Sequence, residues 1–214
     1  MDIFQVFYDS RDEEKSIKMA RYMKNKFPFL GIAKPERMKL SKSFMKQRKK
    51  DIKIDWSLVS KCYNMPEREF HYLALDYVSL LKEKLTLEDI SNIEKLILTN
   101  SWWDSVDCID AIVGNMCLKY PELKESTILK WIYSDNIWLK RVAIDFQLKY
   151  KEKTDTDILT KAILANCNTD EFFVNKAIGW SLREYSKTNK EWVKKFLEDN
   201  KLPALSVREA SKYI

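Results

Sequence analysis

Glycine, proline and histidine are scarce in this sequence of 214 residues, which holds 3 Gly, 5 Pro and one His. Glycine and proline mark the turns of β-rich and loop-rich chains, so their scarcity favours helices joined by short turns. No apolar run approaches the roughly 20 residues that are needed to span a bilayer. The first residues, Met1 to Tyr8, lack a basic segment and a cleavage motif, so we expect no signal peptide. The sequence therefore predicts an all-α protein of the cytoplasm.

The supply of histidine and cysteine excludes several kinds of catalytic and metal site. The four cysteines form no Cys-x-x-Cys pair, and the single His71 cannot complete a zinc cluster. With one histidine we expect no Ser–His–Asp or Cys–His arrangement. No Gly-x-Gly-x-x-Gly or P-loop motif offers a cradle for nucleotide phosphates. We predict reduced thiols, no metal site and no cofactor.

Positive charge is concentrated in the first third of the chain, although the whole sequence carries a net charge of only +6. Residues 15–53 hold 14 Lys or Arg against two acids, which gives +12, whereas residues 54–140 carry a net −5. A basic segment of this size is typical of a phosphate-binding face. A solvated lysine-rich helix surface explains the same counts equally well, so charge alone leaves both interpretations open.

The stretch from Asn100 to Gly114 combines two adjacent tryptophans with three carboxylates. We expect a helix that is capped by Asn100 or Ser101 and ends at Gly114. On such a helix Trp103 and Asp107 lie four residues apart, so an indole face and a carboxylate share one side. A flat ring beside a negative charge suits a flat or cationic ligand. An acidic helix start with tryptophans in the core is the purely structural alternative.

An internal repeat with a period of 35 residues runs through the second half of the chain. It relates Trp103, Trp138 and Phe173, and it also relates Asp110, Asp145 and Trp180. Such a period with helical patterning predicts stacked helix pairs, because one pair is too small to bury its apolar face alone. Equivalent positions then recur along a concave groove or along the hydrophobic seam between repeats. We assign Trp138 and Phe173 to the seam.

Arg141 and Gly179 do not fit a hydrophobic seam. Arg141 follows Trp138 by three residues and faces the same way, yet burying a lone arginine would be costly. Gly179 precedes Trp180 in mid-helix, where glycine costs roughly 1 kcal/mol relative to alanine. We expect the missing side chain to leave room for a flat group close to the helix.

Three separate motifs stand out along the chain, at Ser101–Asp107, Ser134–Arg141 and Lys176–Tyr185. All three closely resemble motifs of the AlkD family of DNA alkylation repair enzymes. The resemblance runs over nearly the whole chain in the right order. It implies an α-α superhelix, or solenoid, of HEAT-like antiparallel helix pairs with a concave DNA-binding face, formed as one domain over residues 1–214. This fold agrees with the repeat period.

The resemblance also implies an activity, that of a monofunctional DNA glycosylase. Such an enzyme hydrolyses the N-glycosidic bond of cationic N3- and N7-alkylated purines, such as 3-methyladenine and 7-methylguanine, and leaves an abasic site. The family's catalytic residues match Trp103, Asp107 and Trp180, with Arg141 beside them. By the same resemblance, contacts to the DNA backbone are assigned to Arg141, Lys149, Arg183 and Tyr22. The implied partner is duplex DNA with alkylated purines, with no membrane, and we expect a monomer.

The chemistry of this lesion fits the residue types. A purine alkylated at these positions is already a cation and leaves without a general acid, while positive charge grows on the deoxyribose. A carboxylate such as Asp107 stabilises that charge and orients the attacking water. Trp103 and Trp180 offer π faces to the sugar or to the cationic base. The alternative is a non-catalytic HEAT-like module that binds DNA or protein, although a carboxylate in a phosphate groove would weaken its binding.

Overall fold

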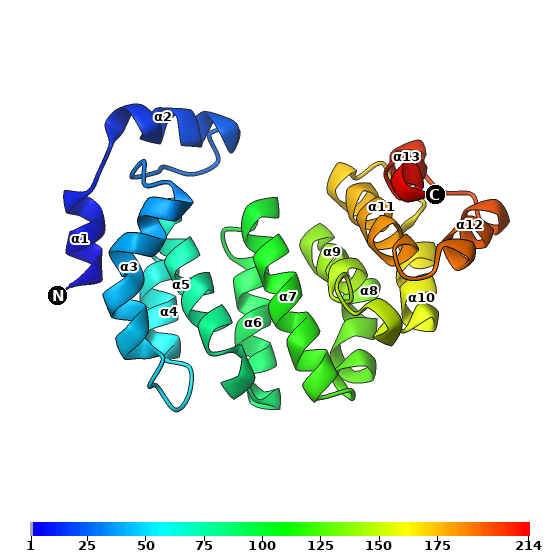
Figure 1. The fold of residues 1–214 in the computed structure, drawn as a ribbon, viewed down its shortest axis with the longest axis horizontal. Helices are drawn as coiled ribbons and strands as arrows, with labels where there is room; N and C mark the ends of the chain where they lie inside the picture. The colour runs from blue at the N-terminus through cyan, green and yellow to red at the C-terminus, as the bar shows by residue number, and fades with distance from the viewer. Residues whose placement is uncertain (1) are drawn as a thin grey trace. The chain divides into compact units, whose positions relative to one another are not determined.

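The computed structural model describes residues 2–214. Within these residues the chain forms thirteen α-helices and no β-strand, which confirms the predicted all-α class (Figure 1). Tertiary contacts divide the chain into two compact units, with the boundary between Leu85 and Thr86. The assignment of residues 1–214 to one domain stays a prediction. Among residues 2–214, no helix combines the length and the apolar character that a bilayer crossing requires.

The first unit is built from helices around the buried face of α5. Its elements are α1 Ile3–Asp9, α2 Glu13–Tyr22, α3 Lys34–Arg48, α4 Trp56–Tyr63, α5 Arg68–Leu80 and the 3-10 turn Lys82–Lys84. Asp2, Asp12 and Asp55 cap the starts of α1, α2 and α4 by accepting hydrogen bonds from backbone N–H groups of the first turn. Because α5 packs against both α3 and α4, its apolar side chains form the core of this unit.

The connection between α2 and α3 is held by the buried carboxylate of Glu69. Its oxygens accept hydrogen bonds from the backbone N–H groups of Leu30, Gly31 and Ile32 at 2.9, 2.9 and 3.1 Å. Gly31 adopts a φ of +90°, and a Cβ there would lie 2.0 Å from the carbonyl oxygen of Asp12. Only glycine fits this turn, which brings the basic helix α3 back onto α5.

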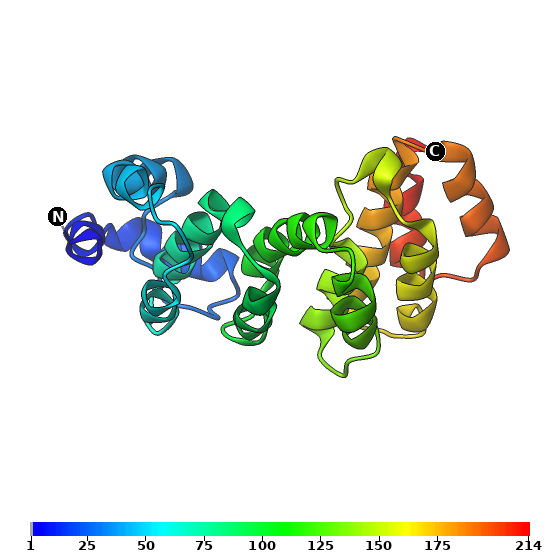
Figure 2. The ribbon, with the colours of Figure 1, turned by 90° about the horizontal axis from the view of Figure 1, so that it is seen from below.

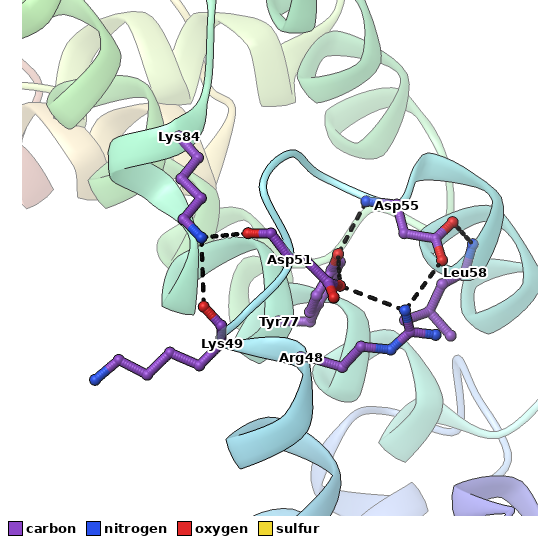
Figure 3. A network of polar contacts seen from close by, with 7 residues as sticks. All are labelled: Arg48, Lys49, Asp51, Asp55, Leu58, Tyr77 and Lys84. Atoms are coloured by element: carbon purple, nitrogen blue, oxygen red, sulfur yellow. Dashed lines mark hydrogen bonds and ion pairs between the residues drawn. The ribbon is translucent and has the colours of Figure 1, made fainter.

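A polar network closes the connection between α3 and α4 (Figure 3). Arg48, the last residue of α3, lies 3.3 Å from carboxylate oxygens of both Asp51 and Asp55. The hydroxyl of Tyr77 donates to Asp51 at 2.8 Å and accepts from the backbone N–H of Asp55 at 2.9 Å. Burial raises the pKa of Tyr77 to about 12, so the hydroxyl keeps the proton that it donates. Lys84 donates to backbone carbonyl oxygens of the same connection.

The second unit contains the repeat that the sequence predicts. Its α-helices are α6 Ile90–Leu98, α7 Trp103–Lys119, α8 Leu129–Ile132, α9 Ile137–Asp145, α10 Thr156–Asn166, α11 Phe172–Ser186, α12 Lys190–Asp199 and α13 Ala204–Ala210. Shorter turns lie at Leu87–Asp89, Lys124–Ile128, Lys151–Lys153 and Ser211–Tyr213. Neighbours in sequence pack as pairs, among them α6 with α7 and α8 with α9.

Alternate helices of the second unit also pack against one another. Helix α9 contacts α7 and α11, and α11 contacts α13, so α7, α9, α11 and α13 form an alternate-helix row (Figures 1 and 2). A period of 35 residues places equivalent residues on successive helices of this row. Side chains that lie about 35 residues apart in sequence are therefore brought into contact.

Helix α7 begins later than the sequence analysis predicts. It begins at Trp103, and the residue at its N-cap position is Trp102, which is in an extended conformation. The prediction that Asn100 or Ser101 occupies the N-cap position is therefore wrong. The hydroxyl of Ser101 instead donates to the carbonyl oxygen of Ile97 in α6.

The predicted end of this helix at Gly114 is also wrong, because α7 continues to Lys119. A Cβ on Gly114 would lie 2.3 Å from the carbonyl oxygen of Phe146, which follows α9. The hydroxyl of Tyr150 donates to the carbonyl oxygen of Gly114 at 2.5 Å. The glycine therefore permits two segments to approach closely in the middle of a helix, and it does not terminate one.

Candidate active site

The alternate-helix row brings the carboxylate of Asp107 on α7 against the guanidinium of Arg141 on α9. Nε and Nη2 of Arg141 lie 3.1 and 2.7 Å from Oδ1 of Asp107. Both bonds end on Oδ1, so Arg141 does not engage Oδ2. The side chain of Asp107 is 23% exposed, which gives it access to solvent while Arg141 fixes its direction.

Arg141 is buried but it is not alone, so the cost expected for a lone buried arginine is offset. Its side chain is 2% exposed. Nη1 donates to the carbonyl oxygen of Phe173 on α11 at 2.8 Å, and Nη2 lies 3.6 Å from Oδ2 of Asp145. Fixed acceptors on three helices surround the guanidinium and determine its orientation.

Burial acts on the ionisation of Asp107 as well as on its position. Desolvation raises the pKa of this carboxyl, whereas the Arg141 guanidinium acts in the opposite direction. Asp104, one turn earlier in α7, adds to the increase by charge repulsion. The carboxylate is thus a partly buried group beside a single cation, which is an arrangement suited to stabilising a positive charge brought to it.

The two tryptophans predicted to act with Asp107 are both half-buried. Trp103 begins α7 and lies four residues before Asp107, so the two share one side of the helix. Trp180 lies on α11, where the guanidinium groups of Arg141 and Arg183 lie 5.5 and 5.7 Å from its ring. Cations at these distances interact favourably with an indole face.

The assignment of Trp138 and Phe173 to the hydrophobic seam is confirmed. Their ring centroids lie 4.9 Å apart, and Trp138 is 9% exposed. The third ring of this cluster belongs to Trp102, which lies 5.8 Å from Trp138 and 5.0 Å from Phe173. The pattern at a spacing of 35 pointed to the neighbouring Trp103 instead, because both of the adjacent tryptophans fit it within one residue.

The repeated aspartates do not line a groove. Asp110 on α7 and Asp145 on α9 are 5% and 1% exposed. Desolvation raises the pKa of both carboxyls, and the Asp145 charge raises that of Asp110 further. Oδ1 of Asp145 lies 2.8 Å from the hydroxyl of Ser181 on α11. No group of three or more metal-ligating side chains within residues 2–214 is arranged to hold an ion.

The space beside Gly179 is filled by the chain itself, so the expectation that a flat ligand group approaches there is wrong. A Cβ on Gly179 would lie 2.5 Å from Cβ of Glu209 and 2.9 Å from the carbonyl oxygen of Ser206, both on α13. The side chain of Glu209, 4% exposed, lies within 2.9 Å of the charged groups of Lys176, Arg183 and Lys212. The glycine allows α13 to pack closely enough to place this carboxylate.

The residues predicted to contact the DNA backbone lie in different parts of the structure. Arg183 is 22% exposed and donates to Glu209 at 2.9 Å. Lys149 is exposed in the turn that follows α9. Tyr22 ends α2 in the first unit and is 69% exposed. The DNA contacts of these residues, and that of Arg141, stay predictions.

Sequence reasoning missed three side chains that organise the site. They are Asp145, Ser181 and Glu209, each of which contacts a predicted site residue or its partner. Asp145 stood in the repeat with Asp110, but the repeat did not reveal that both are buried. The signal for a role of Asp145 was its position one helical turn after Arg141, which places both on one side of α9.

Comparisons with known proteins agree on one family. The family model described as DNA alkylation repair enzyme matches residues 3–214. A solved structure described as a predicted DNA alkylation repair enzyme from Enterococcus faecalis is 37% identical in sequence. It covers 95% of this chain and 96% of its own, with a TM-score of 0.89. This likeness confirms the predicted fold class, an α-α superhelix. No curated protein sequence matches the chain.

Proposed function

Because this chain belongs to the DNA alkylation repair enzyme family, with a role in the repair of alkylated DNA, we propose that it is a monofunctional DNA glycosylase. Its substrates are N3- and N7-alkylated purines in duplex DNA. It hydrolyses the bond between the damaged base and the deoxyribose, and it leaves an abasic site. The observation that carries this proposal is the partly exposed Asp107 carboxylate, whose Oδ1 is held by Arg141 at 2.7 Å.

The reaction needs a carboxylate and little else, because the damaged base is already cationic. The bond between C1′ and the base nitrogen breaks, and its electron pair leaves with the base, which becomes neutral. Positive charge develops on C1′ and the ring oxygen of the sugar. Asp107 stabilises that charge through the oxygen that Arg141 leaves open. Water then forms the new bond to C1′, and its proton passes to Asp107 and on to solvent.

Arg141 acts on this reaction through Asp107. Its guanidinium is buried and directed at protein acceptors, so it favours the ionised form of the carboxylate and fixes the direction of Oδ2. The side of α7 that carries Asp107 also carries Trp103, and Trp180 lies over the guanidinium. Their indole faces suit a sugar or base that bears positive charge, and they exclude water from the other side of the lesion.

Base release from duplex DNA that contains N7-methylguanine tests the proposal. Wild-type protein is compared with Asp107→Asn, which keeps the size of the side chain and removes the charge. Loss of one preorganised electrostatic group typically lowers the rate by about 100-fold to 1000-fold. Asp157→Asn is the matched control, because it removes the same charge from an exposed position on α10 in the same unit.

The outcomes separate catalysis from binding. We expect Asp107→Asn to lose base release while it binds the DNA as well as wild type or better, since a negative charge near phosphates is removed. Equal release by Asp107→Asn and wild type would exclude Asp107 from the mechanism. Binding without release by wild type would favour the non-catalytic DNA-binding module.

A further inference from the structure

The Arg141 guanidinium lies between two carboxyl groups, and it contacts them unequally. Nη2 lies 2.7 Å from Oδ1 of Asp107 but 3.6 Å from Oδ2 of Asp145. Charge-assisted hydrogen bonds between a guanidinium and an ionised carboxylate are about 2.7–2.9 Å long. The longer distance fits a neutral Asp145, although its side chain is wholly buried beside the cation.

The contacts of Ser181 give independent evidence for a proton on Asp145. The Ser181 hydroxyl oxygen lies 2.9 Å from the carbonyl oxygen of Ile144 and 2.8 Å from Oδ1 of Asp145. A hydroxyl donates one hydrogen bond, and neither a carbonyl oxygen nor an ionised carboxylate can donate. With an ionised Asp145 the single Ser181 proton is shared between the two acceptors as a weaker three-centre bond, whereas a protonated Asp145 can donate to Ser181, which then donates fully to Ile144.

The balance of charge inside the alternate-helix row also favours a protonated Asp145. Three carboxyls, Asp107, Asp110 and Asp145, share one guanidinium, Arg141, and two of them are almost wholly buried. An uncompensated buried carboxylate is expensive, so a buried acid without a cation keeps its proton. Arg141 compensates Asp107, which leaves protons on the other two.

We propose that Asp145 is a positioning residue for the reaction. While Asp145 is protonated, the Arg141 guanidinium binds mainly Asp107. When Asp145 is ionised, it attracts the guanidinium away from Asp107. The proposal deepens the proposed glycosylase function and rests on it for its effect on catalysis. The structure represents the protonated state, with a short contact to Asp107 and a long one to Asp145. Ionisation creates a second anion that competes for Nη2. The hydrogen bonds from Arg141 to Oδ1 of Asp107 then weaken, and Oδ2 of Asp107 loses its fixed direction.

The groups around Asp145 determine the pH range in which its carboxyl ionises. Within residues 2–214, these groups are Arg141 on its own helix, Asp107 and Asp110 from α7, and Ser181 from α11. Burial raises the pKa of Asp145 from 3.8 to about 7, and the Arg141 charge acts in the opposite direction. Asp145 therefore ionises near neutral pH and then competes with Asp107 for the same guanidinium.

The test is the pH profile of base release for Asp145→Asn relative to wild type between pH 5.5 and 8.5. Asparagine mimics the protonated acid, since its amide can donate to Ser181 while its oxygen faces Arg141. We expect a variant to wild-type ratio near 1 at pH 6. At pH 8, one pH unit above the midpoint of about 7, the ratio rises to about 10, because only about a tenth of wild-type Asp145 stays protonated. Taking the ratio at each pH cancels the lesion's own response to pH.

Asp157→Asn again provides the matched control, with a ratio that does not change with pH. A ratio for Asp145→Asn that is equally flat would assign Asp145 a structural role and overturn the proposal. So would a wild-type rate that does not fall between pH 7 and 8.5 after correction for the substrate.

Infrared spectra of wild type and Asp145→Asn, both labelled with ¹³C at aspartate carboxyls, test the proton directly and without base release. Because Asp110 is also expected to be protonated, the Asp145 band is the part of the protonated carboxyl C=O signal that is missing from Asp145→Asn at pH 6. We expect that part to lose intensity with a midpoint near 7. Its absence at pH 6, or its persistence unchanged to pH 8.5, would overturn the proposal. If wild type releases no base at any pH but the band titrates, the glycosylase function fails while the proton on Asp145 stands.

Discussion

Removal of the Arg141 guanidinium provides the most direct test of the electrostatics inside the alternate-helix row. In Arg141→Gln, Asp107 and Asp145 lose their shared cation, and the carbonyl oxygen of Phe173 loses its donor. Removal of one partner from a buried ion pair costs about 3–5 kcal/mol. Because Asp107 is 23% exposed, water replaces part of the lost contact, and we expect a loss of about 3 kcal/mol at pH 8.

The loss of stability in Arg141→Gln depends on pH, and its sign follows from the carboxyls. Both Asp107 and Asp145 have pKa values that are raised in the folded protein, so their contribution to stability falls as pH rises through those values. Without Arg141 the pKa values rise further, and the buried acids take up protons more readily at low pH. We therefore expect the loss to shrink to about 1–2 kcal/mol at pH 5.5.

Urea unfolding at pH 5.5 and pH 8 measures this difference through tryptophan fluorescence. Six of the seven tryptophans lie after Thr86 and report on the second unit, whereas Trp56 and far-ultraviolet circular dichroism follow the first unit, which contains the control. Arg37→Gln is the matched control in the first unit, because Arg37 is also buried but pairs with Asp76, which is 37% exposed. Its loss is expected to be similar at both pH values, since water can hydrate Asp76. An equal loss at pH 5.5 and 8 for Arg141→Gln would refute the reasoning.

Two further predictions concern the packing of α13 on α11. Hydrogen bonds from Lys176 and Lys212 lower the pKa of Glu209 to about 2, so its contribution to stability is present above pH 4.5 and is lost as pH falls towards 2. Glu209→Gln is expected to destabilise the protein by about 1–3 kcal/mol at pH 7 and by less near pH 2. Acid unfolding curves check this, and a difference that persists at pH 2 would count against it. Gly179→Ala forces a Cβ to within 2.5 Å of Glu209 and is expected to cost about 1–3 kcal/mol, whereas a raised Tm would show that α13 moves freely.

Two features follow from local sequence: the helical character of the protein, and the position of Trp103 and Asp107 on one face of α7. Scarce glycine and proline predict helices, and an interval of four residues places Trp103 and Asp107 on one side whatever the rest of the chain does. The period of 35 also predicts that Trp138 and Phe173 meet, because a stacked repeat repeats its contacts. These inferences need only the geometry of a helix and of a stack.

Local sequence gave the wrong account where two segments approach each other. Local sequence predicts a helix end at Gly114, yet Gly114 lies inside α7. A glycine is needed there because the carbonyl oxygen of Phe146 leaves no space for a side chain. Gly179 reads as room for a ligand, yet α13 occupies that space. A glycine in a sequence shows that a side chain is absent, but the neighbour that requires this absence comes from a distant part of the chain.

The chemical groups of the site and their order along the helices follow from residue type and from the pitch of a helix, so they can be predicted without a structure. The charge and direction of those groups depend on how the helices pack. Arg141 meets Asp107 across 34 residues, and Ser181 meets Asp145 across 36. Whether a carboxyl is hydrated, paired or left with its proton depends on which helix covers it, and that is settled only when α7, α9 and α11 pack together.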